Sequence, residues 1–260
     1  MTALPGTPAI QNAIPIPYYA TNAFAAPGLG IVAAIIMFTS GMLWLTSRVK
    51  AAHRIGESYG EHGDGVEHEN IGDENQMPIL LAFSPLILVI GLNALFTYAI
   101  FPAMDFTTFN EQFSALDPSK KTGLWAIIVS LVIACIWLIA IAWPRWEHLQ
   151  KTINKGTLGS MLPAFNTASE VGYGAVIASL AGFAILKELV LNVSPTNPLI
   201  SEAVAMTTLA GITGSSSGGL SIALEALGAD YLRLAIENNI SPELLHRVAV
   251  IAAGGFDTLP

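Results

Sequence analysis

Charged side chains are scarce in this sequence. Lys, Arg, Asp and Glu make up 12% of its 260 residues, whereas a soluble globular domain has about 25%. Hydrophobic residues make up 53%, and the mean hydropathy is +0.58. A soluble fold of this size needs a polar exterior and could not bury so much apolar surface. The composition therefore indicates a membrane protein whose main surroundings are the lipid bilayer.

Basic residues and cysteine are also few. The chain has 11 Lys and Arg against 19 Asp and Glu, a net charge of −8, which excludes nucleic-acid binding through a basic patch. The single cysteine, Cys135, excludes a disulfide framework and a cysteine-based zinc site. We expect no metal, no organic cofactor and no nucleic-acid partner.

Three long uncharged runs are present. Residues 1–47 contain no Lys, Arg, Asp, Glu or His, and two further runs cover 28 residues (77–104) and 23 residues (122–144). About 20 apolar residues in a helix cross the hydrocarbon core of a bilayer. We predict membrane-spanning helices at 25–47, 78–102 and 122–144, with residues 1–24 as a separate preceding element. The first run lacks a basic start, so it is not a signal peptide.

The connections between these runs differ in charge. The loop 48–76 carries seven acids between Glu57 and Glu74 and no Lys or Arg among them. His62 and His68 lie there too, but the surrounding glycines favour a solvated connection over a metal site. Six basic residues follow the first and third runs, and two lie between the second and third. This asymmetry favours a cytoplasmic side for the first and third loops.

The region 156–190 consists of two apolar pieces that flank a polar stretch at 163–170. Each piece is too short to span comfortably, and Pro163 is unsuited to the middle of a helix, whereas Asn166 and Thr167 are good N-cap residues. We therefore predict a re-entrant hairpin that turns near Pro163–Glu170.

The region 198–229 contains a second interruption. Four glycines and three consecutive serines lie between 211 and 219, which suits an unwound segment lining a cavity rather than a continuous helix. We predict a discontinuous helix here, with Ser217 capping a helix that begins at Gly218. Two helix N-termini that face one small volume would attract an anion, as at the midplane of secondary transporters.

Two other interpretations compete. Small residues also allow close helix packing, although packing does not require helices to stop. Gly214–Gly218 fits the G-x-S-x-G pattern, and Ser216, Asp230 and His246 follow in the hydrolase order. That pattern requires a soluble strand–turn–helix, so we do not expect an enzyme.

Ionisable residues near the interruptions are candidates for a proton or cation route. These are Glu170, Glu225 and Asp257, each of which could instead be a local cap or ion-pair partner. His246 and Arg247 follow a predicted helix start at Ser241, within the last element, 241–260. We expect Arg247 to lie on a hydrated surface.

Several stretches resemble the gluconate permease family of gluconate:proton symporters, and in particular its D-β-hydroxybutyrate permease-like members. These stretches are AAPGLG (25–30), NTASE (166–170), GGLSIAL (218–224), ELLHRVA (243–249) and GGFDTLP (254–260). The resemblance implies a proton-coupled importer of small hydroxy-carboxylates, built from two inverted repeats with a re-entrant hairpin in each. It also implies that the chain corresponds mainly to the second half of a permease, truncated at both ends.

The resulting prediction is an all-α polytopic membrane protein of the bacterial inner membrane, a partial transport domain with a re-entrant hairpin and discontinuous helices. Its partners are a small organic anion, a proton and the bilayer, with a homodimer as a further association. The alternatives are a Na⁺-coupled organic-anion carrier and a membrane scaffold that transports nothing. Residues 1–24 are interpreted as the end of the first repeat, in which the opening GTPAIQN (6–12) is the counterpart of the terminal Thr258-Leu259-Pro260. The predicted substrate-binding residues are Asn166, Thr167, Ser169, Gly214, Ser215, Ser216, Ser217, Gly218, Gly219, Thr7, Asn12 and Thr258, with Glu170 and Asp257 coupling the proton.

Overall fold

The computed structural model describes residues 4–57, 78–107, 121–143, 149–194 and 197–255, and all regular secondary structure within them is helical. The first part contains α1 (Ile10–Ala13), α2 (Ile16–Tyr19) and α3 (Pro27–Arg54). The second contains α4 (Ile79–Leu95), the π-helical turn η2 (Phe96–Ile100), α5 (Phe101–Ala103) and α7 (Thr122–Ile141). The third contains α8 (Leu149–Ser179), α9 (Ala181–Leu191), α10 (Pro198–Thr213), α11 (Ser216–Glu237) and α12 (Pro242–Ala253).

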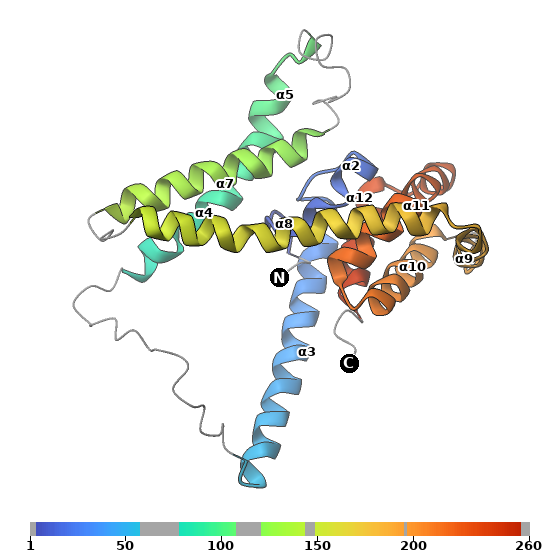
Figure 1. Cartoon of the computed structure of the whole chain (residues 1–260), viewed down its shortest axis with the longest axis horizontal. Coiled ribbons are helices and arrows are strands. Elements are labelled where there is room, and N and C mark those ends of the chain that lie inside the picture. The colour runs from blue at the N-terminus through green and yellow to red at the C-terminus, as the bar shows by residue number, and fades with distance from the viewer. Residues whose placement is uncertain (1–3, 58–77, 108–120, 144–148, 195–196, 256–260) are drawn as a thin grey trace.

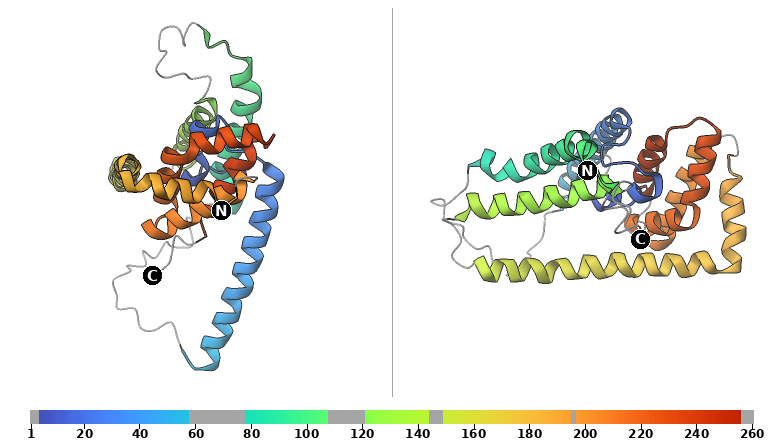
Figure 2. Two further views of the ribbon diagram at one scale, coloured as in Figure 1. Left: turned by 90° about the vertical axis from the view of Figure 1, so that its right-hand side faces the viewer. Right: turned by 90° about the horizontal axis from the view of Figure 1, so that it is seen from above.

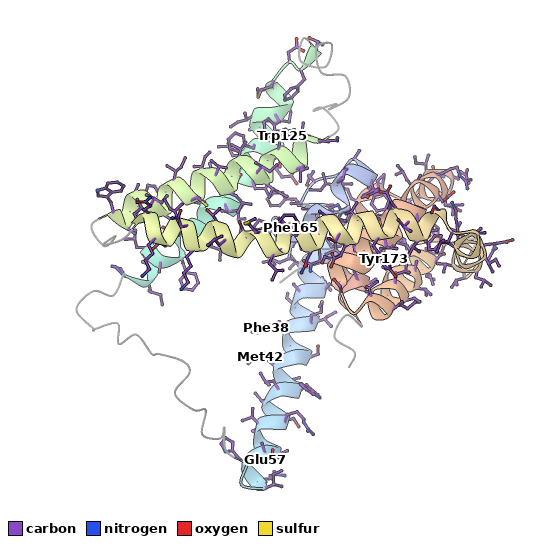
Figure 3. All side chains as sticks on the ribbon, viewed as in Figure 1. Phe38, Met42, Glu57, Trp125, Phe165 and Tyr173 are labelled. Carbon is purple, nitrogen blue, oxygen red and sulfur yellow. The ribbon has the colours of Figure 1, made fainter. Side chains whose placement is uncertain are left out.

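Among the described residues, three helical segments are long and apolar enough to cross a membrane: Pro27–Arg54, Ile79–Ala103 and Thr122–Ile141. Figure 1 shows α3 extending away from the other helices, and Phe38 and Met42 on it are 70% and 44% exposed (Figure 3). Exposed apolar side chains of this size are unfavourable in water and favourable in lipid. The surface of the described residues therefore fits a bilayer environment.

The helices form an open arrangement. Figure 2 shows α8 running along one side, with α4 and α7 at one end and α10, α11 and α12 at the other. Helices α4 and α7 pack on each other, and α11 packs on both α8 and α10. The main buried core lies among α2, α10, α11 and α12. The end that holds α10 to α12 is thus the packed part of the described chain.

Helix α8 differs from the predicted hairpin. It continues without interruption through Pro163 to Ser179, so the expected turn at 163–170 is wrong. The chain instead bends by 83° between α8 and α9, where Leu180 has extended backbone angles. A proline removes a single intrahelical hydrogen bond, whereas a hairpin at membrane depth leaves several backbone groups without partners. Continuing the helix is the less costly solution.

Sequence signals explain where the later helices begin and end. Asn197 and Ser241 cap α10 and α12, because their side chains accept hydrogen bonds from the amides of Leu199 and Glu243. A proline follows each cap at the first helical position, where its missing N–H costs nothing. Helix α10 ends at Thr213, and its C-cap Gly214 has the left-handed backbone angle φ +62° that glycine adopts most easily.

Gly219 allows α10 and α11 to approach each other closely. A Cβ atom at this position would lie 2.3 Å from the backbone of Ala210. At that separation the helices would have to move apart, because neither contacting group is a flexible side chain. The glycine therefore fixes the distance between the two helices just beyond the chain interruption.

We expect Gly219→Ala to lower the free energy of unfolding by about 1–3 kcal/mol, the usual range for an overpacked contact. The matched control is Gly172→Ala on α8, where an added Cβ meets nothing within 4 Å. That change should be neutral or stabilising by up to about 1 kcal/mol, because alanine favours helices. Denaturant unfolding of the intact protein in micelles measures both, and equal stabilities would contradict the close approach.

Candidate functional site

The chain is interrupted between α10 and α11 by only two residues, Gly214 and Ser215. Ser215 has extended backbone angles and caps α11, since its Oγ accepts a hydrogen bond from the amide of Gly218 at 3.1 Å. The predicted cap at Ser217 is therefore wrong: α11 begins at Ser216. Because Gly214 takes the left-handed turn, Ser215 is the first residue whose geometry suits an N-cap.

Glu170 from α8 lies against this helix start. Its Oε1 accepts a hydrogen bond from Ser215 Oγ at 3.1 Å, and its Oε2 accepts one from Ser217 Oγ at 3.3 Å. A Cβ added to Gly218 would lie 3.2 Å from the Glu170 carboxyl carbon. The absence of a side chain at Gly218 thus lets the carboxylate reach the first turn of α11.

The first turn of α11 has further donors. Among the described residues, the amide N–H groups of Ser216 and Ser217 have no hydrogen-bond acceptor. The first amides of any helix lack intrahelical partners and carry a partial positive charge. A carboxylate suits such a position, and in this structure the Glu170 carboxylate lies beside it, where it accepts hydrogen bonds from the hydroxyls of Ser215 and Ser217.

A cavity of about 360 Å³ adjoins these groups. Its volume is at the lower end of the range of small-molecule sites. Apolar side chains make up most of its wall, and Glu170 is its single charged lining residue. The lining residues are Glu170, Tyr173, Ile177, Leu209, Ile212, Thr213, Ser215, Gly218 and Ile222.

Three of these lining residues follow the spacing of one helix face. Glu170, Tyr173 and Ile177 are separated by three and then four positions on α8, which places them on one side of the helix. Gly174 on the same side approaches Ile222 of α11, where an added Cβ would lie 2.8 Å from the Ile222 side chain. The sequence interpretation missed Tyr173 and Ile177, although a helical reading of the stretch after Glu170 would have found them.

Other predicted residues of α8 lie outside this cavity. Asn166 and Ser169 are exposed. Thr167 donates a hydrogen bond to the carbonyl of Pro163 within its own helix and lines a separate, open cavity of about 690 Å³ together with Ile10 of α1. The structure thus joins Glu170, but not its three predicted neighbours, to the serine segment.

The predicted residues near the N-terminus form a second polar cluster. Asn12 is fully buried, and its amide donates to the carbonyls of Thr7 and Ala23. Its Oδ1 lies 3.2 Å from Nη1 of Arg247 and 3.3 Å from Nε2 of His246. The hydrogen-bonding groups of Asn12 are therefore engaged by protein.

Arg247 is completely buried, so the expectation that it lies on a hydrated surface is wrong. Its guanidinium donates to the carbonyl of Ala25 from both Nε and Nη2, at 2.9 and 2.7 Å, and to that of Ala23 at 3.3 Å. These carbonyls belong to the irregular segment between α2 and α3. The spacing from Ser241 places position 247 on an early turn of α12, but it could not show that an unwound chain lies opposite.

Some predicted residues fall outside the described part of the chain. Asp257 and Thr258 are in this group, as are His62, His68 and the acidic stretch that follows residue 57. Within the described residues, no three His, Cys, Asp or Glu side chains gather as metal ligands would. The remaining predicted residue, Ser216, is buried at the start of α11.

One curated relative is informative. The chain is 41% identical to a protein of Bacillus subtilis (strain 168) that is named an uncharacterized transporter, YxjC, and the alignment covers all of this chain. The chain spans 58% of that relative's length. No family model matches the sequence, and no solved structure matches it. With three helices of spanning length, the similarity supports a multi-pass membrane protein related to a transporter.

The two serines that bond to Glu170 should contribute unequally to stability. Ser215→Ala removes a helix cap and should lower the free energy of unfolding by about 0.5–2 kcal/mol. Ser217→Ala should lower it less, because it removes one hydrogen bond to Glu170 while the bond from Ser215 remains. Unfolding of both variants in micelles, compared with Ser179→Ala at an exposed position, measures the difference. A loss for Ser217→Ala as large as that for Ser215→Ala would contradict the assignment of the cap.

Proposed function

We propose that this chain is part of a secondary transporter of the bacterial cytoplasmic membrane that imports small hydroxy-carboxylates together with protons. The substrate site is the cavity between α8 and the α10–α11 interruption. The observation that supports this most directly is the Glu170 carboxylate at the N-terminus of α11. A carboxylate is thus accommodated there by two serine hydroxyls, and the adjacent amides of Ser216 and Ser217 have no acceptor among the described residues.

The substrate carboxylate would bind the unpartnered amides of Ser216 and Ser217, with the Ser217 hydroxyl as a further donor. Gly218 leaves room for this approach, since an added Cβ would crowd both Ser215 and Glu170. The hydroxyl groups of a hydroxy-acid would meet the polar rim formed by Thr213 and Tyr173, and its carbon chain would meet the isoleucines of the wall. Asn166 and Ser169 remain candidates for contact during entry, on the open side of α8.

Glu170 would couple the proton to the anion. When it is ionised, it occupies the helix start and excludes a second negative charge by repulsion in a medium of low dielectric constant. When it is protonated, it cannot accept the same two charge-assisted bonds, and the serine hydroxyls become available. Proton and substrate therefore bind better together than separately, which is the thermodynamic requirement of a symporter.

The Ser217 hydroxyl should strengthen substrate binding. We expect Ser217→Ala to weaken binding of the transported hydroxy-acid about ten- to a hundredfold, because a hydrogen bond to a charged group contributes about 1.5–3 kcal/mol. Ser179→Ala, whose hydroxyl bonds within its own helix on the exposed side of α8, should leave the affinity unchanged. Equilibrium binding to the complete protein in micelles measures both, and unchanged affinity for Ser217→Ala would contradict the proposed contact.

Glu170→Gln should separate binding from coupling. The amide imitates a protonated carboxyl group, so we expect exchange of labelled hydroxy-acid to persist while accumulation driven by a pH gradient is lost. Uptake into proteoliposomes with and without an uncoupler measures this, with Glu188→Gln at an exposed position of α9 as the control.

Accumulation by the Glu170→Gln protein would assign coupling to another group, and Asp257→Asn should be measured in parallel for that reason. Uptake that depends on Na⁺ at fixed pH would instead support a Na⁺-coupled carrier. If no hydroxy-acid stabilised the complete protein against unfolding and none were transported by it, the result would support a membrane scaffold.

A further inference from the structure

A buried acid lies on α10, away from the cavity. Glu202 is fully buried, and its Oε1 accepts a hydrogen bond from the hydroxyl of Tyr19 on α2 at 2.5 Å. Its other oxygen, Oε2, is also buried and has no hydrogen-bond partner among the described residues. The sequence interpretation did not single out this residue, and the proposed substrate site does not use it.

The described surroundings of Glu202 contain no compensating positive charge. The titratable groups that face it are the phenols of Tyr19 on α2 and Tyr231 on α11. On α12, His246 contacts Thr21 and Asn12. Arg247 donates to Asn12 and to the carbonyls of Ala23 and Ala25. On α9, Lys187 forms an ion pair with Asp230. Next to Glu202, the Ser201 hydroxyl donates to the carbonyl of Val190.

An ionised carboxylate in this position would be costly. A buried charge without a partner has a large desolvation penalty, and a buried oxygen without a donor adds to it. A bound proton removes the charge, and it leaves an acid whose carbonyl oxygen can accept the Tyr19 bond. Two phenols and one engaged serine hydroxyl are too few oxygen ligands for a metal cation, whereas a proton needs no coordination shell.

We propose that Glu202 is a second proton-binding site, which holds a proton at neutral pH and exchanges it during transport. This proposal rests on the proposed function and deepens it, because it assigns a further acid to the coupling ion. Glu202 lies eleven residues before the end of α10 at Thr213, a distance of about 16 Å along the helix. The two acids thus lie at opposite ends of one continuous helix, since Glu170 contacts the segment immediately after Thr213.

Infrared spectroscopy tests the proton directly and does not depend on transport. A protonated carboxyl group gives a carbonyl stretching band that an ionised one lacks, and we expect Glu202→Gln to lose such a band from the spectrum of the complete protein at pH 7. Glu188→Gln, at an exposed position of α9 outside the proposed proton route, is the control and should leave the band in place. Tyr19→Phe keeps the acid and should shift the same band.

The second measurement is the number of protons carried with each substrate in proteoliposomes. We expect Glu202→Gln to lower that number by one and Glu188→Gln to leave it unchanged. Identical infrared spectra for wild type and Glu202→Gln, with no shift in Tyr19→Phe, would overturn the proton site, whether or not the protein transports hydroxy-acids. Loss of the band with an unchanged proton number would overturn its part in transport. A complete protein that transports no hydroxy-acid would instead contradict the proposed function, and the infrared result would still decide the occupancy of Glu202.

Discussion

Where a helix is interrupted, its free backbone N–H and C=O groups need hydrogen-bond partners from elsewhere in the protein. This constraint explains where the polar side chains of the described residues lie. Water is not available at membrane depth to partner a free N–H or C=O. The segment between α2 and α3 and the segment between α10 and α11 are both irregular. The buried side chains of Asn12 and Arg247 and the half-buried Glu170 each lie against one of these two segments.

The side chains beside the two interruptions match the backbone groups that lack helical partners there. Between α2 and α3, Arg247 donates to the carbonyls of Ala23 and Ala25, and Glu243 accepts a hydrogen bond from the amide of Ala26. At the start of α11 the backbone groups without helical partners are amides, and the carboxylate of Glu170 lies there with the serine hydroxyls. The first is closed within a packed core, whereas the second opens to a cavity. The proposed exchange of an internal anion for an external one therefore belongs to the second interruption.

The sequence predicts features that depend on neighbouring residues and does not predict contacts between residues far apart in the chain. Spanning helices depend on the composition of about 20 consecutive residues, and the interruption after Thr213 depends on a local glycine and serine, so both kinds of feature are visible in the chain itself. The hairpin expected at Pro163 failed because one proline is a weak break when the alternative exposes more backbone. The burial of Arg247 and the Tyr19–Glu202 bond depend on elements more than 180 positions apart in sequence, which no local pattern records.

The same long-range packing explains why α10 can connect the two acids. Close contact at Gly219 fixes its far end to α11, while the Tyr19 bond joins its near half to α2. A continuous helix transmits displacement along its axis, because its backbone hydrogen bonds resist stretching. The left-handed Gly214 after α10 has no such hydrogen-bond ladder and can change its backbone angles more easily. In the proposed transporter, a change of charge at Glu202 would alter the Tyr19 contact, and any movement of α10 would be taken up at the Gly214–Ser215 junction. That junction is also where Ser215 bonds to Glu170, so protonation of one acid would alter the geometry in which the other meets the helix start.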